Sequence, residues 1–462
     1  MKNMQNFWDF SVWGGVNLVA VLLISLFGAN MLKKAIPFLK KSLIPTSVLG
    51  GTILLIIAVI YNLITGDIMF DTAFFGSNGS QTLEVITYHT LALGFIATAF
   101  KPSKGRFTKQ RNIEIFNTGV TTVATYLMQG VLGLGITLLA TLFMKDMFAA
   151  AGVLLPFGYG QGTGQALNYG GIYETDWGFV GGKSFGLTIA ALGFISASIG
   201  GVIHLNIIKK QGRIKVVDSD TSANLITSDI QGDDEIPMNG SMDKLSVQMA
   251  FVFTAYVISY IIIYFLGNLL PGLKSVLYGF NFLIGVLIAT LLCSFVAFLR
   301  KKGLVRRQHI NTFLMKRISG FFFDLMVIAG IAAIRVDTLK RYWVVMLVLG
   351  VVGAFFTYYY NRFVARKLFK DYEEQQFLAM YGMLTGTAST GVILMREIDP
   401  EYETPAADNL VYQNLPAIVF GFPMMLLAVL APKEPILTLV ILFAFFVVMN
   451  IILFRKFIFK KR

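Results

Sequence analysis

Long apolar segments alternate with short polar ones along almost the whole chain. A helix needs about 20 consecutive apolar residues to cross roughly 30 Å of hydrocarbon. Eleven segments of that kind are expected near residues 12–32, 44–64, 82–100, 114–143, 178–207, 247–270, 279–299, 318–335, 342–361, 408–430 and 435–454. The pattern therefore predicts an all-α polytopic membrane protein.

Two further apolar stretches, about 147–173 and 375–400, are interrupted by the same short pattern. Gly158-Tyr-Gly-Gln-Gly-Thr163 and Gly382-Met-Leu-Thr-Gly-Thr387 share a glycine, three residues and then Gly-Thr, and the two threonines lie 224 positions apart. Broken backbone at membrane depth is tolerated only where it is buried in protein or lines a watery cavity. We therefore predict two re-entrant hairpins, because matched breaks in repeated halves mark the substrate site of a secondary transporter.

The basic residues indicate an orientation. If the first helix runs from outside to inside, 31 of the 39 Lys and Arg residues fall in cytoplasmic segments. Cytoplasmic loops of membrane proteins carry this excess. The bias predicts a multi-pass protein of the inner (plasma) membrane, with the N-terminus outside and the C-terminus in the cytoplasm. The net charge of +13 is then a topology signal, and no nucleic-acid partner is expected.

With this orientation the two halves are inverted repeats. Each contains four helices, a hairpin and a fifth helix, but the first half starts outside and the second inside. We predict a first repeat over 1–208, a flexible polar cytoplasmic linker over 209–244, a second repeat over 245–430, and an extra transmembrane helix with a basic tail over 431–462. Substrate sites in such proteins lie near the midplane between the repeats.

Other classes of protein are less well supported. Cys293 is the single cysteine and the three histidines are scattered, so neither a metal cluster nor an enzyme's nucleophile–base pair is expected. The segment Phe157-Gly-Tyr-Gly160 is similar to a potassium-channel filter, whose carbonyl rings replace hydration water. The preceding Thr-Val is absent and the second copy reads Gly-Met-Leu. An ion channel is thus a remote alternative.

The layout and the broken segments resemble the sodium/glutamate symporter family. Tyr159-Gly-Gln-Gly-Thr163 stands beside the family's Gly-Gly-His-Gly-Thr, and Gly386-Thr-Ala-Ser-Thr390 beside its Gly-Ala-Thr-Pro-Thr. The resemblance in layout covers about 10–430. It implies sodium-coupled import of an anionic amino acid such as glutamate, by a homodimer in which a hairpin-bearing unit slides against a scaffold as an elevator. An inverted-repeat carrier of another carboxylate and a cation/proton exchanger remain as alternatives.

The chemistry of the two breaks agrees with an anionic substrate and a small cation. Backbone N–H groups at the start of a half-helix, together with the helix dipole, suit a carboxylate. Carbonyl and hydroxyl oxygens at broken ends suit sodium, the one coupling ion expected; no cofactor is predicted. The candidate substrate-binding residues are Gly160, Gln161, Gly162, Thr163 and Gly164 in a first tip, and Gly386, Thr387, Ser389 and Thr390 in a second tip.

Polar residues within other apolar segments complete the prediction. Asp324 lies inside a predicted helix, where a charged group is costly and commonly functional. We predict that it binds the coupling ion together with Thr163 and Thr387; pairing within the bundle is the alternative. Asn409 and Asn414 open the helix after the second hairpin and are expected to face that hairpin as further substrate ligands.

Overall fold

The computed structural model describes residues 6–41, 43–100, 108–212, 235–238, 242–271, 274–279, 281–399 and 403–458. Its secondary structure is helical, and the β-type pairing among these residues is an isolated bridge between Glu235 and Gln308. Nine of the described helices are long and apolar enough to cross a membrane. The predicted all-α, multi-pass architecture is therefore confirmed.

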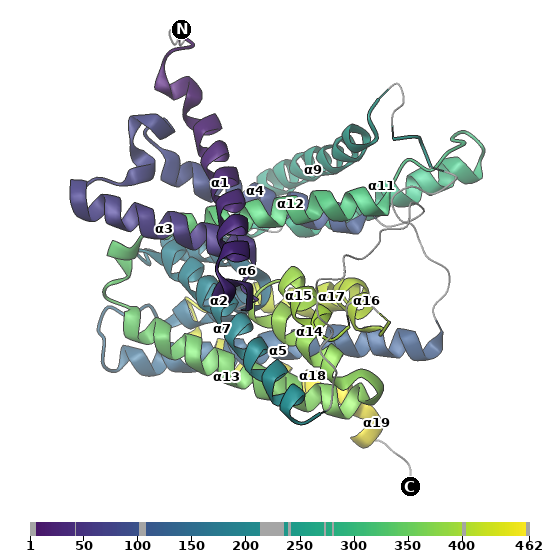
Figure 1. Cartoon of the computed structure of the whole chain (residues 1–462). Coiled ribbons are helices and arrows are strands. Elements are labelled where there is room, and N and C mark those ends of the chain that lie inside the picture. The colour runs from purple at the N-terminus through teal and green to yellow at the C-terminus, as the bar shows by residue number, and fades with distance from the viewer. Residues whose placement is uncertain are drawn as a thin grey trace. The chain divides into compact units, whose positions relative to one another are not determined.

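The elements follow one another in the order that the hydrophobic pattern predicts (Figure 1). Those of the first half are α1 (Phe10–Ala35), α2 (Pro37–Lys41), α3 (Thr46–Thr65), η1 (Met69–Asp71), η2 (Ala73–Phe75), α4 (Gly79–Ala99), α5 (Lys109–Thr141), η3 (Ala149–Val153), α6 (Leu154–Trp177) and α7 (Gly182–Lys210). Those of the second half are α9 (Lys244–Leu269), α10 (Lys274–Gly279), α11 (Asn281–Lys301), α12 (Thr312–Ala332), η5 (Val336–Leu339), α13 (Trp343–Leu368), η6 (Lys370–Tyr372), α14 (Glu373–Thr385), α15 (Ala388–Arg396), α16 (Ala406–Tyr412) and α17 (Asn414–Leu430). The chain continues with α18 (Pro435–Leu453) and α19 (Arg455–Ile458).

Three of the eleven predicted spans differ clearly from the structure, and one of them, predicted over 342–361, continues to Leu368 as α13. The span predicted from residue 318 begins at Thr312, because Asn311 caps the helix: its Oδ1 accepts a hydrogen bond from the Leu314 amide at 2.7 Å. The span predicted over 408–430 is divided at Gln413 into α16 and α17. Pro416 has no N–H to donate to the preceding turn, so one hydrogen bond of the helix is missing close to this division.

Residue contacts group the chain into two compact units. The first contains Met1–Val85, Phe107–Asp220 and Val327–Arg462, and the second contains Ile86–Arg106 and Thr221–Met326. Each unit takes segments from both halves of the sequence. The boundaries predicted from the sequence describe repeats rather than such units, and they stay a prediction.

The second unit has its own core and a buried ion pair. Its apolar core includes Phe100, Val252 and Phe322. Lys244, which is fully buried, donates to Glu235 at 2.7 Å, and Asn311 donates to the same carboxylate at 2.6 Å. The predicted linker 209–244 is therefore anchored at its C-terminal end. Residues 213–234 and 239–241 of that linker lie outside the described residues.

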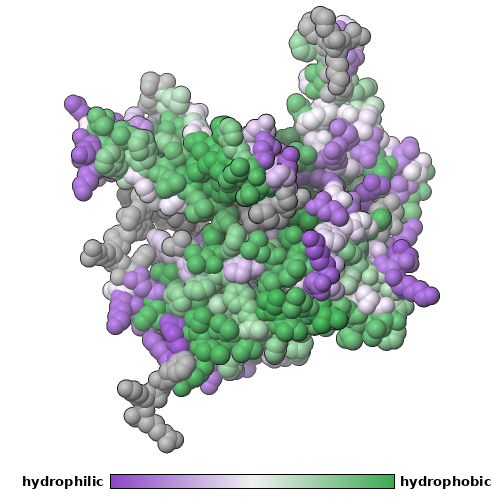
Figure 2. Space-filling view, turned by 180° about the vertical axis from the view of Figure 1, so that it is seen from behind, coloured by the Kyte–Doolittle hydropathy of each residue, from purple (hydrophilic) through white to green (hydrophobic). Residues whose placement is uncertain are grey.

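Large apolar side chains are exposed on many of the described helices, as suits a membrane protein. Figure 2 shows hydrophobic residues gathered over much of the face in view. On α13, exposed apolar side chains recur every four residues at Leu347, Val351 and Phe355. Since residues four apart lie on one face of a helix, α13 presents a continuous apolar stripe of the kind that suits lipid.

Candidate functional site

The chain folds back at both Gly-Thr sequences. In α6 the helix is broken at Gly162, whose φ of 78° and ψ of −170° are not helical. The Phe157 ring, before the break, stacks on the Tyr169 ring beyond it, with centroids 3.9 Å apart and an interplanar angle of 10°. Phe148 likewise packs against Tyr173. The two arms therefore lie side by side, with the first tip between them.

The second hairpin is formed by α14 and α15. Its arms are so close that a Cβ on Gly382 would lie 2.7 Å from the Cα of Gly391. Between the arms, Thr387 has extended backbone, and the backbone of Gly386 is neither helical nor extended. The first hydrogen bond of α15 runs from the Gly391 amide to the Thr387 carbonyl at 3.1 Å. The amides before Gly391 thus open the helix at the second tip, where a helix leaves its N–H groups for other partners.

One turn of α5 contacts both tips. The Tyr126 hydroxyl donates to the carbonyl oxygen of Gly160 at 2.9 Å, next to the break in α6. Three residues further on, Gln129 donates from Nε2 to the carbonyl oxygen of Leu384 at 2.9 Å, at the end of α14. Residues three apart are neighbours on a helix surface. The two patterns that are 224 positions apart in the sequence are therefore held at one place in the fold.

Helix α7 joins the two hairpins from another side. A Cβ on Gly193 would lie 2.5 Å from the Thr385 carbonyl oxygen and 3.1 Å from Cδ2 of Tyr159. One turn later, Ser196 hydrogen-bonds through Oγ to the Tyr159 hydroxyl at 2.9 Å, and its carbonyl oxygen accepts from the Tyr381 hydroxyl at 2.9 Å. Gly193 thus lets both hairpins approach α7 closely.

The tip residues are largely closed to solvent. Gly160, Gly162, Thr163, Gly164 and Gly386 are buried, whereas Gln161 is half-buried. In the second tip Thr390 is buried and Thr387 is half-buried, and their hydroxyl oxygens lie 3.3 Å apart. Thr163 packs against α12, since a Cβ on Gly330 would lie 2.7 Å from its Cβ. Nothing is described for the side chain of Ser389.

A buried donor beside the first tip has no hydrogen-bond partner among the described residues. Gln165 lies in the first turn after the break and is fully buried. Its Oε1 accepts from Asn168, but its Nε2 has no hydrogen-bond partner among the described residues. Buried polar groups are normally hydrogen-bonded. An acceptor group of a ligand would satisfy this amide together with the backbone N–H groups of the same turn.

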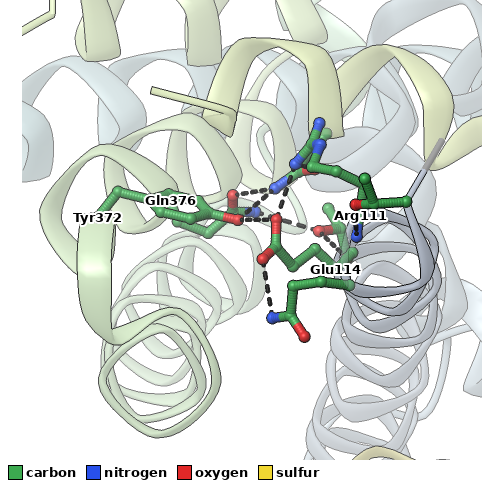
Figure 3. Close-up of polar contacts among 8 residues, drawn as sticks. Arg111, Glu114, Tyr372 and Gln376 are labelled. Carbon is green, nitrogen blue, oxygen red and sulfur yellow. Dashed lines mark hydrogen bonds and ion pairs between the residues drawn. The ribbon is translucent and has the colours of Figure 1, made fainter. Parts of the chain in front are cut away.

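The predicted ligand Asn409 lies in a polar cluster at the base of the second hairpin. Figure 3 shows Arg111 and Glu114 of α5 facing Tyr372 and Gln376. Asn409 accepts from Arg111 Nη1 at 2.9 Å and donates to Gln376 Oε1 at 2.9 Å and to the Tyr372 hydroxyl at 3.1 Å. Glu114 accepts from Arg111 and Tyr372, both at 2.8 Å. This base cluster ties α5, the second hairpin and α16 together.

A buried ion-pair cluster around Glu374, the second residue of α14, also holds the second hairpin. Glu374 accepts two hydrogen bonds from Arg362 of α13, at 2.5 and 2.6 Å, and one from His204 of α7 at 2.8 Å. Burial by itself raises the pKa of the Glu374 carboxyl, but the bonds from His204 and Arg362 outweigh it and lower that pKa to about 2. Glu374 therefore remains a carboxylate that anchors the hairpin.

The predicted ligands Asn414 and Asp324 belong to different compact units. Asn414 is half-buried and accepts from Gln413 at 3.1 Å, and Gln413 in turn contacts Met383 of the second hairpin. Asp324 is half-buried on α12 and belongs to the second compact unit, whereas both tips belong to the first. Within the first unit, Thr163 and Thr387 stand at the two tips.

Sequence reasoning missed the side chains that hold the tips. Tyr126 and Gln129 lie inside a long apolar helix, and Gln129 is fully buried there. A glutamine in a membrane helix is a signal in itself, because its amide needs partners. The sequence could not indicate that the partner would be Leu384. From the sequence, Arg111, at the start of the same helix, is only one of the basic residues of a predicted cytoplasmic segment.

Apolar helices surrounding two broken elements, with the breaks meeting in a buried polar centre, are typical of a secondary transporter. The sequence matches the sodium/glutamate symporter family over residues 14–404, and the chain belongs to this family. It is thus a sodium-coupled glutamate transporter rather than an enzyme. A search of curated proteins gives no match.

Proposed function

We propose that the two tips form a single site in which glutamate and sodium bind together during symport. The observation that supports this most strongly is that one turn of α5 holds both breaks, through Tyr126 on Gly160 and Gln129 on Leu384. Two breaks that served only for close packing would not need a shared polar support. The family makes glutamate the expected substrate.

Glutamate would bind through its carboxylates at the openings of the two half-helices. The buried Nε2 of Gln165, in the first turn after the break at Gly162, would be the donor of one set. The amides that open α15, with the hydroxyls of Thr387 and Thr390, form the other. Helix N-termini attract anions because their N–H groups are unpaired and their dipoles are positive there. Gln161 and Ser389, where the chain departs from the family's motif, would adjust substrate choice.

The remaining predicted ligands have supporting roles in this proposal. Thr163 and Thr387 would offer hydroxyl oxygens to sodium, and Asp324 stays a proposed ligand of the coupling ion. Asn409 already makes three hydrogen bonds in the base cluster. It would therefore influence substrate binding by fixing the second hairpin, with Asn414 beside it at the start of α17.

We further propose that the two halves are inverted repeats with re-entrant hairpins. Each hairpin contacts the helix that precedes the other hairpin: Tyr159 of α6 donates to the Gly350 carbonyl of α13 at 2.6 Å, and Leu384 of α14 accepts from Gln129 of α5. This reciprocal contact is expected of two repeats that interlock at a midplane site. An external N-terminus, a cytoplasmic C-terminus, a homodimer and an elevator movement complete the proposal.

The function is tested by uptake into proteoliposomes of the purified chain. Labelled glutamate, aspartate and a dicarboxylate are each offered with an inward sodium gradient and with equal sodium on both sides. We expect glutamate to accumulate only with the gradient and labelled sodium to enter with it. Faster accumulation of the dicarboxylate would favour a different carboxylate carrier. Sodium movement driven by a pH gradient without any carboxylate would contradict symport.

A further inference from the structure

A layer of four polar side chains lies between α5 and α13. Thr125 and Gln129 are four residues apart on α5, and Thr357 and Asn361 are four apart on α13, so each pair shares one helix face. All four are fully buried. None of them was a candidate from the sequence. Polar side chains inside a membrane are costly and are commonly retained for function.

Both amide nitrogens of this layer donate hydrogen bonds, whereas both amide oxygens lack a partner in the part of the chain that the structure describes. Gln129 Nε2 donates to Thr357 Oγ1 and to the Leu384 carbonyl, both at 2.9 Å. Asn361 Nδ2 donates to the Thr357 carbonyl at 2.9 Å and to Thr125 Oγ1 at 3.4 Å. Gln129 Oε1 and Asn361 Oδ1 are buried without a hydrogen-bond partner among the described residues.

Turning the two amides around does not remove the problem. A reversed Gln129 would place its oxygen against the Leu384 carbonyl oxygen, and a reversed Asn361 would place its oxygen against the Thr357 carbonyl oxygen. Both arrangements bring two acceptors together. The two amide oxygens are therefore left without a partner among the described residues, and an unsatisfied buried acceptor costs about 1–3 kcal/mol.

We propose that a sodium ion binds in this layer, with Gln129 Oε1 and Asn361 Oδ1 as ligands and Thr357 Oγ1 beside them. The inference rests on the proposed sodium symport and gives one of its ions a place. A hard cation prefers neutral and charged oxygen ligands, and membrane transporters bind sodium through such oxygens near broken helices. The ion would satisfy both acceptors at once.

This site would connect sodium to the second tip. Gln129 holds the ion through Oε1 and the Leu384 carbonyl through Nε2, and Leu384 stands directly before Thr385, the last residue of α14. A bound ion would fix the Gln129 side chain and, through it, the end of α14. Sodium would then raise the affinity for glutamate, and glutamate would raise the affinity for sodium by the same factor.

The test measures glutamate uptake by proteoliposomes as a function of sodium concentration. Asn361→Leu removes one ligand at nearly constant volume, and we expect the half-saturating sodium concentration to rise roughly ten- to a hundredfold. Asn361→Asp keeps the oxygen and adds a negative charge, so it should lower that concentration several-fold at neutral pH. Asn450→Leu is the matched control: its Nδ2 makes the same bond four residues back, at 2.8 Å, but its Oδ1 accepts from Tyr360 at 2.9 Å.

A second measurement does not require transport. Sodium should raise the thermal unfolding temperature of the purified wild type and of Asn450→Leu relative to choline, because a ligand stabilises the state that binds it. Asn361→Leu should lose most of this increase. If both Asn361 variants are folded and respond to sodium as the wild type does, the proposed sodium site is wrong, but sodium-coupled symport is not contradicted. If wild-type uptake itself is independent of sodium, the proposed function fails with it.

Discussion

Gly162→Val should abolish glutamate transport while leaving folded protein in the membrane. The φ of 78° at Gly162 belongs to the left-handed region, which a β-branched residue adopts only with strain. Residues held in such conformations cost about 1–3 kcal/mol each. The strain would fall on the half-helix opening at which we propose that the substrate carboxylate binds, so the loss should exceed any effect on folding.

Gly386→Val should give the same result for a different reason. The backbone there has a negative φ, but a Cβ would lie 3.0 Å from both Cδ1 of Phe194 and Oγ1 of Thr390. Gly135→Val is the control, since no atom lies within 4 Å of a Cβ at that position in α5. Uptake is normalised to folded protein by size-exclusion chromatography in detergent. Normal transport by both tip variants would mean that the tips are packing elements.

Among the substitutions considered, removing the Glu374 carboxylate should lower the free energy of unfolding the most. The group is buried and accepts from both Arg362 and His204. Deleting one partner of a buried ion pair typically costs about 3–5 kcal/mol, and the carboxylate that Arg362 would keep, Glu373, lies further away at 3.8 Å. We therefore expect Glu374→Ala to lower the thermal unfolding temperature sharply, and Glu374→Leu combined with Arg362→Met to recover much of it.

The pH dependence of this contribution has a definite sign. Because the folded-state pKa of Glu374 is lowered to about 2, its contribution is fully present above the ordinary carboxyl pKa near 4.5 and is lost as the pH falls toward 2. The wild type should therefore lose stability over that range faster than the double variant. Equal unfolding temperatures for wild type and Glu374→Ala at neutral pH would contradict the role of the anchor.

The hydrophobic pattern predicted most spans because length and hydropathy are local properties. Helix α13 illustrates this, since its apolar stripe is visible in the sequence. The break at Gly162 could also be predicted, because glycine and threonine interrupt an apolar run. The division at Gln413 was missed, although Pro416 three residues later was a signal for it.

The supports of the site depend on contacts between distant segments, which one sequence does not contain. Gln129 is 255 residues from Leu384, and Glu374 is 170 residues from His204. Gln129 and Glu374 are recognisable as polar groups that need partners. Only the packing of α5, α7 and α13 around the hairpins identifies those partners. The same holds for the two compact units, which combine segments of both halves.

The most direct test of the single shared site uses the two tip threonines. Thr163→Val and Thr387→Val each remove one hydroxyl and keep the shape, and Thr290→Val, whose hydroxyl only bonds back to Val286, is the control. A lost hydrogen bond to a charged group costs about 1.5–3 kcal/mol, or roughly ten- to a hundredfold in affinity. The half-saturating concentrations of glutamate and of sodium are measured in proteoliposomes for all three variants. We predict that each tip variant raises at least one of these concentrations by that factor, with normal amounts of folded protein and with no change in the control. If both tip variants keep wild-type values for glutamate and sodium, the two tips do not form the site.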